Sequence, residues 1–141
     1  MDHVSVVVED LHAAIAFFTE LGLKADGEAP IEGAWVDRIN AIDGIKVNIT
    51  MMRTPDGHGA LELTKFHNPP AISEEPKIAP PNALGLRSVM FEVEDVDDMV
   101  ARLGKHGGEL VGEIVNYENY YRLCYLRGPQ GIIVALAEKL G

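Results

Sequence analysis

Two stretches of the chain carry nearly the same pattern: HVSVVVEDL, residues 3–11, and SVMFEVEDV, residues 88–96. Each has a short valine-rich run, then an acidic pair, then the first residue of a helix-like pattern. Short β-rich runs of this kind are typical of strands, and an aspartate directly before a helical pattern is typical of an N-cap. The two stretches therefore predict the same strand-to-helix unit twice.

The similarity extends beyond these stretches, because a shift of 85 residues aligns positions 3–28 with positions 88–113 without a gap. Eight of the 26 aligned pairs are identical, and Gly22/Gly107 is one of them. A glycine at this place suits the left-handed residue that ends a helix. Two copies at such a long spacing indicate an internal duplication and not a solenoid of short repeats.

Three further strands are expected in each half of the chain. They are placed at residues 34–40, 45–52 and 60–66 in the first half and at 109–116, 121–127 and 132–138 in the second. Their β-rich composition between turn signals supports this reading. Asp43-Gly44 predicts a tight hairpin turn between the first two. The predicted fold class is α+β, with two βαβββ modules.

The segment 67–86 holds five of the chain's eight prolines. Such a composition does not build regular elements and favours an extended, stiff connector. The predicted organisation is a first module at 1–66, a linker at 67–86 and a second module at 87–141, which together make one domain. Modules that pair within one chain and modules exchanged between two chains both remain open, and a homodimer is expected.

The composition excludes several classes of protein. A chain of 141 residues with 47% hydrophobic and 24% charged residues fits one globular domain with a real core. The net charge of -10 argues against a nucleic-acid partner, which requires a basic patch. No hydrophobic run approaches the roughly 20 residues of a membrane span. The first strand begins too early for a signal peptide to precede it, so a cytoplasmic protein is expected.

Paired modules that open with H-V-x-V-x-V-x-D-L and close on a P-x-G turn before a strand resemble the vicinal oxygen chelate superfamily. This is also called the glyoxalase, bleomycin-resistance and extradiol dioxygenase family. The resemblance covers nearly the whole chain and implies curled mixed sheets around a cup, with the helices packed outside. Because the superfamily includes lyases, epimerases, dioxygenases, thiol transferases and metal-free binding proteins, the resemblance implies a fold more than one activity.

In the metal-dependent members, each module gives two ligands to one divalent ion, often a histidine on its first strand and a glutamate on its last. By this resemblance His3 and Glu62 are the metal ligands of the first module. Ser88 and Ala135 stand at the corresponding positions of the second module. A catalytic divalent site usually has three protein ligands, so the site is expected to be degenerate. The expected cofactor is none, or a weakly held Zn, Ni, Fe or Mn ion.

The alternation of side chains along a strand agrees with this alignment. His3 shares a strand face with Ser5, and Glu62 lies on the face opposite its apolar neighbours, so both can point into the cup. Glu138 lies three residues after Ala135 and therefore on the opposite face, so it could become a ligand only through a bulge. An intact site would otherwise need a ligand from elsewhere, for which the candidates are His58, His67, Tyr121 or a second subunit.

Two functions from different classes remain open. The first is a protein that binds a small molecule in a cup without a complete metal site. Its expected ligand contacts are Arg38, Met51, Met90, Tyr121 and Tyr125, with Trp35 as a further wall. The second is a metal-dependent lyase, isomerase or dioxygenase that chelates vicinal oxygens through His3 and Glu62, with Glu62 also serving as the base. The number of metal ligands favours the binding protein.

Overall fold

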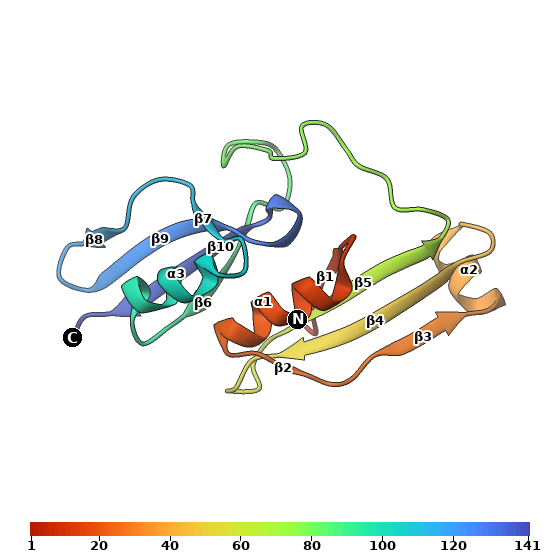
Figure 1. Ribbon diagram of the computed structural model, residues 1–141, viewed down its shortest axis with the longest axis horizontal. Helices are drawn as coiled ribbons and strands as arrows, with labels where there is room; N and C mark the ends of the chain where they lie inside the picture. The colour runs from red at the N-terminus through yellow and green to blue at the C-terminus, as the bar shows by residue number, and fades with distance from the viewer. The chain divides into compact units, whose positions relative to one another are not determined.

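The computed structural model describes all of residues 1–141 and divides them into two compact units, Met1–Ser73 and Glu74–Gly141 (Figure 1). Each unit is built on one five-stranded sheet of mixed parallel and antiparallel strands. This confirms the predicted α+β class and the duplication. The predicted limits of the linker, 67–86, stay a prediction. None of the helices is long and apolar enough to cross a membrane.

The first unit contains two helices and five strands. In chain order they are β1 (Val4–Val7), α1 (Leu11–Leu21), β2 (Lys24–Ala25), β3 (Ala29–Glu32), α2 (Ala34–Asn40), β4 (Lys46–Arg53) and β5 (Ala60–Asn68). The sheet has the order β1-β5-β4, and both β2 and β3 pair with β4. Strands β1 and β5 are parallel, while the other pairs are antiparallel. The central strand β5 therefore places its residues between those of β1 and β4.

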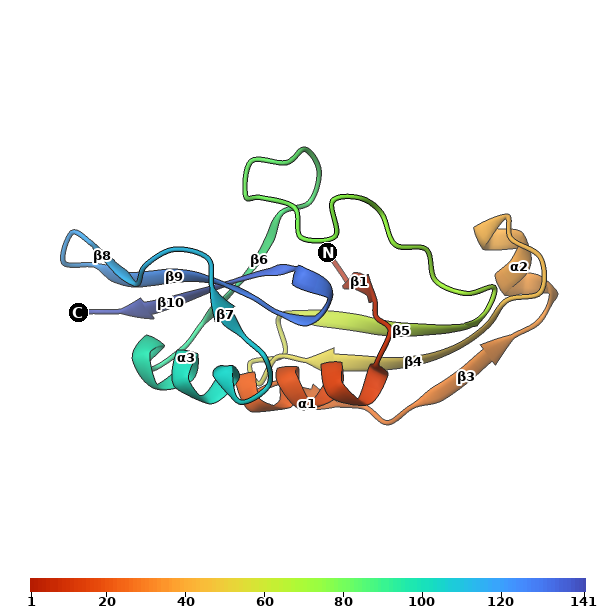
Figure 2. The ribbon, with the colours of Figure 1, turned by 45° about the horizontal axis from the view of Figure 1, so that its top comes forward.

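Helix α1 covers one face of this sheet (Figure 2). It begins where the Asp10 carboxylate accepts a hydrogen bond from the Ala13 backbone N–H at 2.9 Å, and it ends at Gly22, whose φ is 115°. Its buried side chains include Phe17 and Phe18, and the sheet buries Leu63. Full burial of one such side chain contributes about 1.5–3 kcal/mol. The opposite face of β1 and β5, which carries Ser5 and Glu62, is left for a site.

The second unit repeats this plan with one helix. Its elements are β6 (Ser88–Glu92), α3 (Val96–Gly104), β7 (Glu109–Leu110), β8 (Val115–Tyr117), β9 (Tyr121–Arg127), a short 3-10 turn (Pro129–Gly131) and β10 (Ile133–Lys139). The order is β6-β10-β9, with β7 and β8 both on β9, and β6 is parallel to β10. Asp95 caps α3 as Asp10 caps α1, since its carboxylate accepts from the Asp98 N–H at 3.0 Å.

The strand predicted at residues 34–40 is wrong, because this segment forms helix α2. The edge strand beside β4 is supplied earlier in the chain by β3. The Asp37 carboxylate then accepts hydrogen bonds from the backbone N–H groups of Gly44 and Ile45 at 2.9 and 2.8 Å. Val36 packs against Ile45 and Val47. The Asp43-Gly44 turn consequently joins a helix to β4 and is not a hairpin between two strands.

Helix α2 packs at one end of the sheet, on the face opposite α1. The residues around Val36 include Val47, Ile49 and Phe66, which alternate along β4 and β5 with the residues that face α1. Figures 1 and 2 place α2 where β3 ends and β4 begins. Within the first unit, this helix covers one end of the face that carries Glu62.

The strand predicted at residues 109–116 is shorter and interrupted. The chain forms β7 over Glu109–Leu110 and β8 over Val115–Tyr117, and both pair with β9. Gly112 lies between them. The strands predicted at 45–52, 60–66, 121–127 and 132–138 are present with shifts of at most two residues at their ends.

Candidate functional site

His3 and Glu62 lie together on the face of the first sheet that α1 does not cover. Glu62 pairs in register with Ser5 of β1 and with Met51 of β4. His3 comes directly before β1, and its Nε2 atom lies 3.6 Å from Glu62 Oε2. The two side chains are 34% and 25% exposed, so solvent or a ligand can reach both. The structure brings together the two residues that the sequence predicted as partners.

Two hydroxyl groups hold the Glu62 carboxylate in place. Ser5 Oγ and Thr64 Oγ1 each donate a hydrogen bond to Glu62 Oε1 at 3.2 Å. Thr64 is buried, which restricts its motion and so the motion of the carboxylate that it contacts. Oε2 remains on the side of His3 and has no such donor. The carboxylate is therefore fixed through Oε1, and Oε2 can accept a hydrogen bond from a ligand.

The second sheet repeats the register of the first but not its chemistry. Ala135 pairs with Met90 of β6 and with Tyr125 of β9, as Glu62 pairs with Ser5 and Met51. The shift of 85 residues turns Ser5 into Met90. The strand pairing thus supports the alignment of Glu62 with Ala135. On the first sheet the Glu62 carboxylate lies between Ser5 and Met51. On the second sheet the Ala135 methyl group lies between Met90 and Tyr125.

Glu138 cannot replace the missing carboxylate in this arrangement. It lies on the opposite face of β10, as the alternation of the strand predicts, and its Oε1 accepts a hydrogen bond from the Val96 backbone N–H at 2.8 Å. Val96 is the first residue of α3, where backbone N–H groups lack partners within the helix. Glu138 therefore serves the start of α3.

The residues present do not fit a resident divalent ion. His3 and Glu62 supply two ligands, and no group of three or more His, Cys, Asp or Glu side chains lies close enough to hold a metal. His58 lies in the turn after β4, where its Nδ1 is 3.7 Å from Asp56 Oδ2. His67 lies in a different hollow of the first unit. Two such ligands would bind a divalent ion only weakly.

The other predicted ligand contacts are divided between the units. Met51 lies beside Glu62 on the same face of the first sheet. Met90 and Tyr125 flank Ala135 on the second sheet and are 55% and 42% exposed. Tyr121, at the start of β9, shares the face of Tyr125. Met90, Tyr121 and Tyr125 therefore all have large side chains that are exposed to solvent.

Arg38 and Trp35 lie on α2 and not on a strand, which corrects their expected setting. Arg38 is exposed in the last turn of the helix, and Trp35 is 61% exposed. Arg53, at the end of β4, forms an ion pair with Asp26, whose Oδ2 lies 2.5 Å from its Nε. The structure shows no contact of Arg53 or Trp35 with Glu62.

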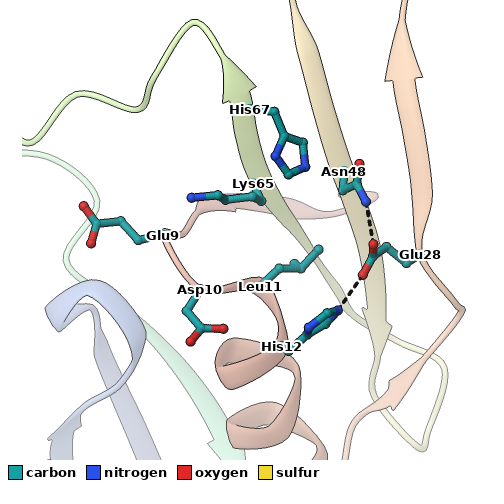
Figure 3. A pocket seen from close by; sticks show the side chains of 8 residues that line it. All are labelled: Glu9, Asp10, Leu11, His12, Glu28, Asn48, Lys65 and His67. Carbon is teal, nitrogen blue, oxygen red and sulfur yellow. Dashed lines mark hydrogen bonds and ion pairs between the residues drawn. The ribbon is translucent and has the colours of Figure 1, made fainter.

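A shallow hollow of about 290 Å³ lies elsewhere in the first unit, where α1 begins (Figure 3). Its wall includes His12, Glu28, Asn48, Lys65 and His67. Glu28 accepts hydrogen bonds from Asn48 at 2.5 Å and pairs with His12 at 3.0 Å, and these contacts hold the pKa of its carboxyl below the ordinary value. The sequence pattern does not reveal this hollow, because its residues come from four separate segments.

Three comparisons place the chain among known proteins. The family model of the Glyoxalase/Bleomycin resistance protein/Dioxygenase superfamily matches residues 1–136. The Escherichia coli K12 protein YaeR, whose name describes it as uncharacterized, is 28% identical over 138 residues, 97% of this chain and 94% of YaeR. A glyoxalase family protein from Bacillus cereus is 56% identical in its crystal structure, with a TM-score of 0.95, and the match covers 100% of this chain and 94% of that chain.

A more distant structure agrees in fold. The trypanothione-dependent glyoxalase I of Leishmania major is 21% identical, with a TM-score of 0.65, over 98% of this chain and 85% of that chain. At this identity the likeness concerns the fold alone. The family-model match over almost the whole chain confirms the resemblance carried by the repeated HVSVVVEDL pattern. The chain belongs to the Glyoxalase/Bleomycin resistance protein/Dioxygenase superfamily.

Proposed function

We propose that this protein binds a small molecule through the open face of its first sheet, with His3 and Glu62 as the polar centre of the site. The observation that carries the proposal is the fixed Glu62 carboxylate, which has one oxygen held by Ser5 and Thr64 and the other turned toward His3 at 3.6 Å. A few convergent polar groups on an otherwise apolar surface are typical of a ligand site.

Apolar and adaptable side chains would supply the walls of this site. Met51 lies next to Glu62, and thioether side chains adjust to ligands of different shape. Met90, Tyr121 and Tyr125 are exposed on the second sheet and are proposed as ligand contacts within that unit. Arg38, which is exposed on α2, is the remaining proposed contact and suits an anionic part of the ligand.

The charge of the protein bears on the ligand and the partners. The net charge of -10 weakly favours a cationic compound and disfavours nucleic acid. The proposal takes the protein to be a cytoplasmic homodimer that acts on a free small molecule and has no nucleic-acid or membrane partner. Glu62 would then act as a hydrogen-bond acceptor for the ligand.

The second candidate is a divalent-metal-dependent lyase, isomerase or dioxygenase that chelates vicinal oxygens through His3 and Glu62, with Glu62 as the base. The nearness of these two side chains favours it. The aligned Ser88 and Ala135 count against it, because neither is a ligand of Zn, Ni, Fe or Mn comparable with histidine or glutamate.

A thermal-shift screen of small cationic and neutral compounds, in the presence of EDTA, tests the proposal. We expect hits whose binding shifts the amide NMR signals of Ser5 and Glu62 and weakens at least tenfold in Glu62→Gln, because a hydrogen bond to a charged group contributes about 1.5–3 kcal/mol. The matched control is Glu32→Gln on the exposed edge strand β3. Binding that Glu62→Gln leaves unchanged would contradict the proposal, and binding that EDTA abolishes would favour the metal enzyme.

A further inference from the structure

The imidazole ring of His3 lies between two carboxylates. Its Nδ1 atom is 2.7 Å from Asp2 Oδ2, and its Nε2 atom is 3.6 Å from Glu62 Oε2. Asp2 is 92% exposed and belongs to no helix or strand. Its contact with His3 is the feature to explain.

The two distances assign different roles to the two ring nitrogens. A separation of 2.7 Å is that of a strong hydrogen bond, and an ionised carboxylate only accepts, so Nδ1 must carry the proton. A separation of 3.6 Å is too long for a hydrogen bond, so no hydrogen bond to Glu62 holds a proton on Nε2.

We propose that Asp2 is a positioning residue that holds His3 in the Nδ1–H tautomer and turns its bare Nε2 atom toward Glu62. The hydrogen bond at one ring nitrogen decides which form the other takes. The role of Asp2 in ligand binding rests on the function proposed above, whereas the tautomer itself is a property of the protein without ligand.

This arrangement sets the class of ligand that the pair accepts. Nε2 of His3 and Oε2 of Glu62 are then two neighbouring acceptors, and Oε1 of Glu62 is already occupied by Ser5 and Thr64. Two acceptors at 3.6 Å repel each other and are satisfied together by a group that donates N–H or O–H hydrogen bonds to both. Ammonium, amidinium and guanidinium groups have this chemistry.

Long-range 1H–15N NMR of the histidine rings tests the proposal on the full chain without ligand, near pH 8. A protonated ring nitrogen and a bare one give well-separated 15N signals, so the tautomer is read directly. We expect Nδ1–H for His3 in the wild type and a change to the Nε2–H form, which free imidazole prefers, in Asp2→Ala. Asp2→Asn keeps a carbonyl acceptor and should retain the Nδ1–H form.

The matched control is Asp56→Ala, which removes the carboxylate 3.7 Å from Nδ1 of His58 and should leave the signals of His3 unchanged. An Nε2–H or doubly protonated His3 in the wild type would overturn the proposal, as would an unchanged tautomer in Asp2→Ala or its loss in Asp2→Asn. Because Asp2 is exposed, these variants should keep the amide spectrum of the fold. If the tautomer is as stated but no compound binds, the proposed function fails and the positioning role stands.

Discussion

Glu62 and Ala135 occupy the same position in the two sheets. Each lies on the last strand of its unit, paired on one side with the residue two places after His3 or Ser88 and on the other side with an antiparallel strand. The duplication has therefore kept the backbone of both half-sites and only the first half-site has a histidine and a carboxylate. The changes at His3/Ser88 and Glu62/Ala135 are two of those that distinguish the halves, and both are open to experiment.

The double substitution Ser88→His/Ala135→Glu should give the second sheet a pair like His3 and Glu62. We expect the second sheet of this variant to gain a weak Zn²⁺ site that the wild type lacks, measured by isothermal titration calorimetry, because histidine and glutamate are zinc ligands and Ser88 and Ala135 are not. Ala135 is fully buried, so the larger side chain should cost about 1–3 kcal/mol of stability. The control is Ser88→His/Ala135→Gln, which has the same shape without the carboxylate. Equal Zn²⁺ affinity in the two variants would contradict the alignment of the half-sites.

The N-caps Asp10 and Asp95 should contribute equally to the two units. Each carboxylate accepts one hydrogen bond from the first turn of its helix, at 2.9 and 3.0 Å. Asp10→Ala and Asp95→Ala should each lower the free energy of unfolding by about 1 kcal/mol, measured by urea denaturation. Asp10→Asn and Asp95→Asn are the controls, since asparagine also caps helices. An alanine variant as stable as the wild type would show that its cap is not needed.

Ala41 ends α2 in a strained backbone conformation, with φ 55° and ψ 40°. A left-handed residue with a Cβ atom costs roughly 1–2 kcal/mol, and glycine avoids this cost but loses more entropy on folding. We expect Ala41→Gly to stabilise the protein by about 0.5 kcal/mol in urea denaturation. Ala16→Gly within α1 should instead destabilise it by about 1 kcal/mol. A loss of stability in Ala41→Gly would rule out strain at this residue.

The ion pair of Asp97 with Arg122 should make the free energy of unfolding depend on pH. Arg122 donates from Nε and Nη2 to the two Asp97 oxygens at 2.8 and 3.0 Å, and this lowers the Asp97 pKa from its ordinary value of 3.8. A carboxyl whose folded pKa is lowered stabilises the protein above its unfolded pKa, and this contribution disappears as the pH falls through the folded pKa. Asp97→Asn should therefore be less stable than the wild type near pH 7.

The difference between Asp97→Asn and the wild type should shrink as the pH falls below 3.8. Urea denaturation at a series of pH values measures it. The control is Asp43→Asn, at an exposed residue for which the structure shows no ion pair. If the difference between Asp97→Asn and the wild type stays constant with pH, the Asp97 carboxylate is not the source of the stabilisation.

Local patterns predicted the parts of the fold that local chemistry decides. Asp10 and Asp95 are caps because a short acidic side chain before a helix satisfies the unpaired N–H groups of its first turn. Glu62 faces away from α1 because alternation along a strand is strict, and the same rule places Glu138 on the side of α3. These statements need only the sequence of one element.

Contacts between elements decided what the sequence did not predict. Trp35, Val36 and Ile39 are residue types that favour a strand. However, β3 already pairs with β4, and Val36 packs against Ile45 and Val47 as part of a helix. The hollow near His12 and Glu28 is lined by residues from four separate segments that only the fold brings together. The hydrogen bond between Asp2 and His3 joins adjacent residues. Its consequence for the site depends on the approach of His3 to Glu62, which lies on another strand.

The metal content of protein purified without a histidine tag tests the central claim most directly. The account holds that the first sheet has a His3 and Glu62 pair for a small molecule, while the second has Ser88 and Ala135 at the aligned positions. It predicts well below one equivalent of Zn, Ni, Fe or Mn per chain by plasma mass spectrometry, in the wild type and in Glu62→Ala alike. One tightly held ion per chain that Glu62→Ala loses would contradict it.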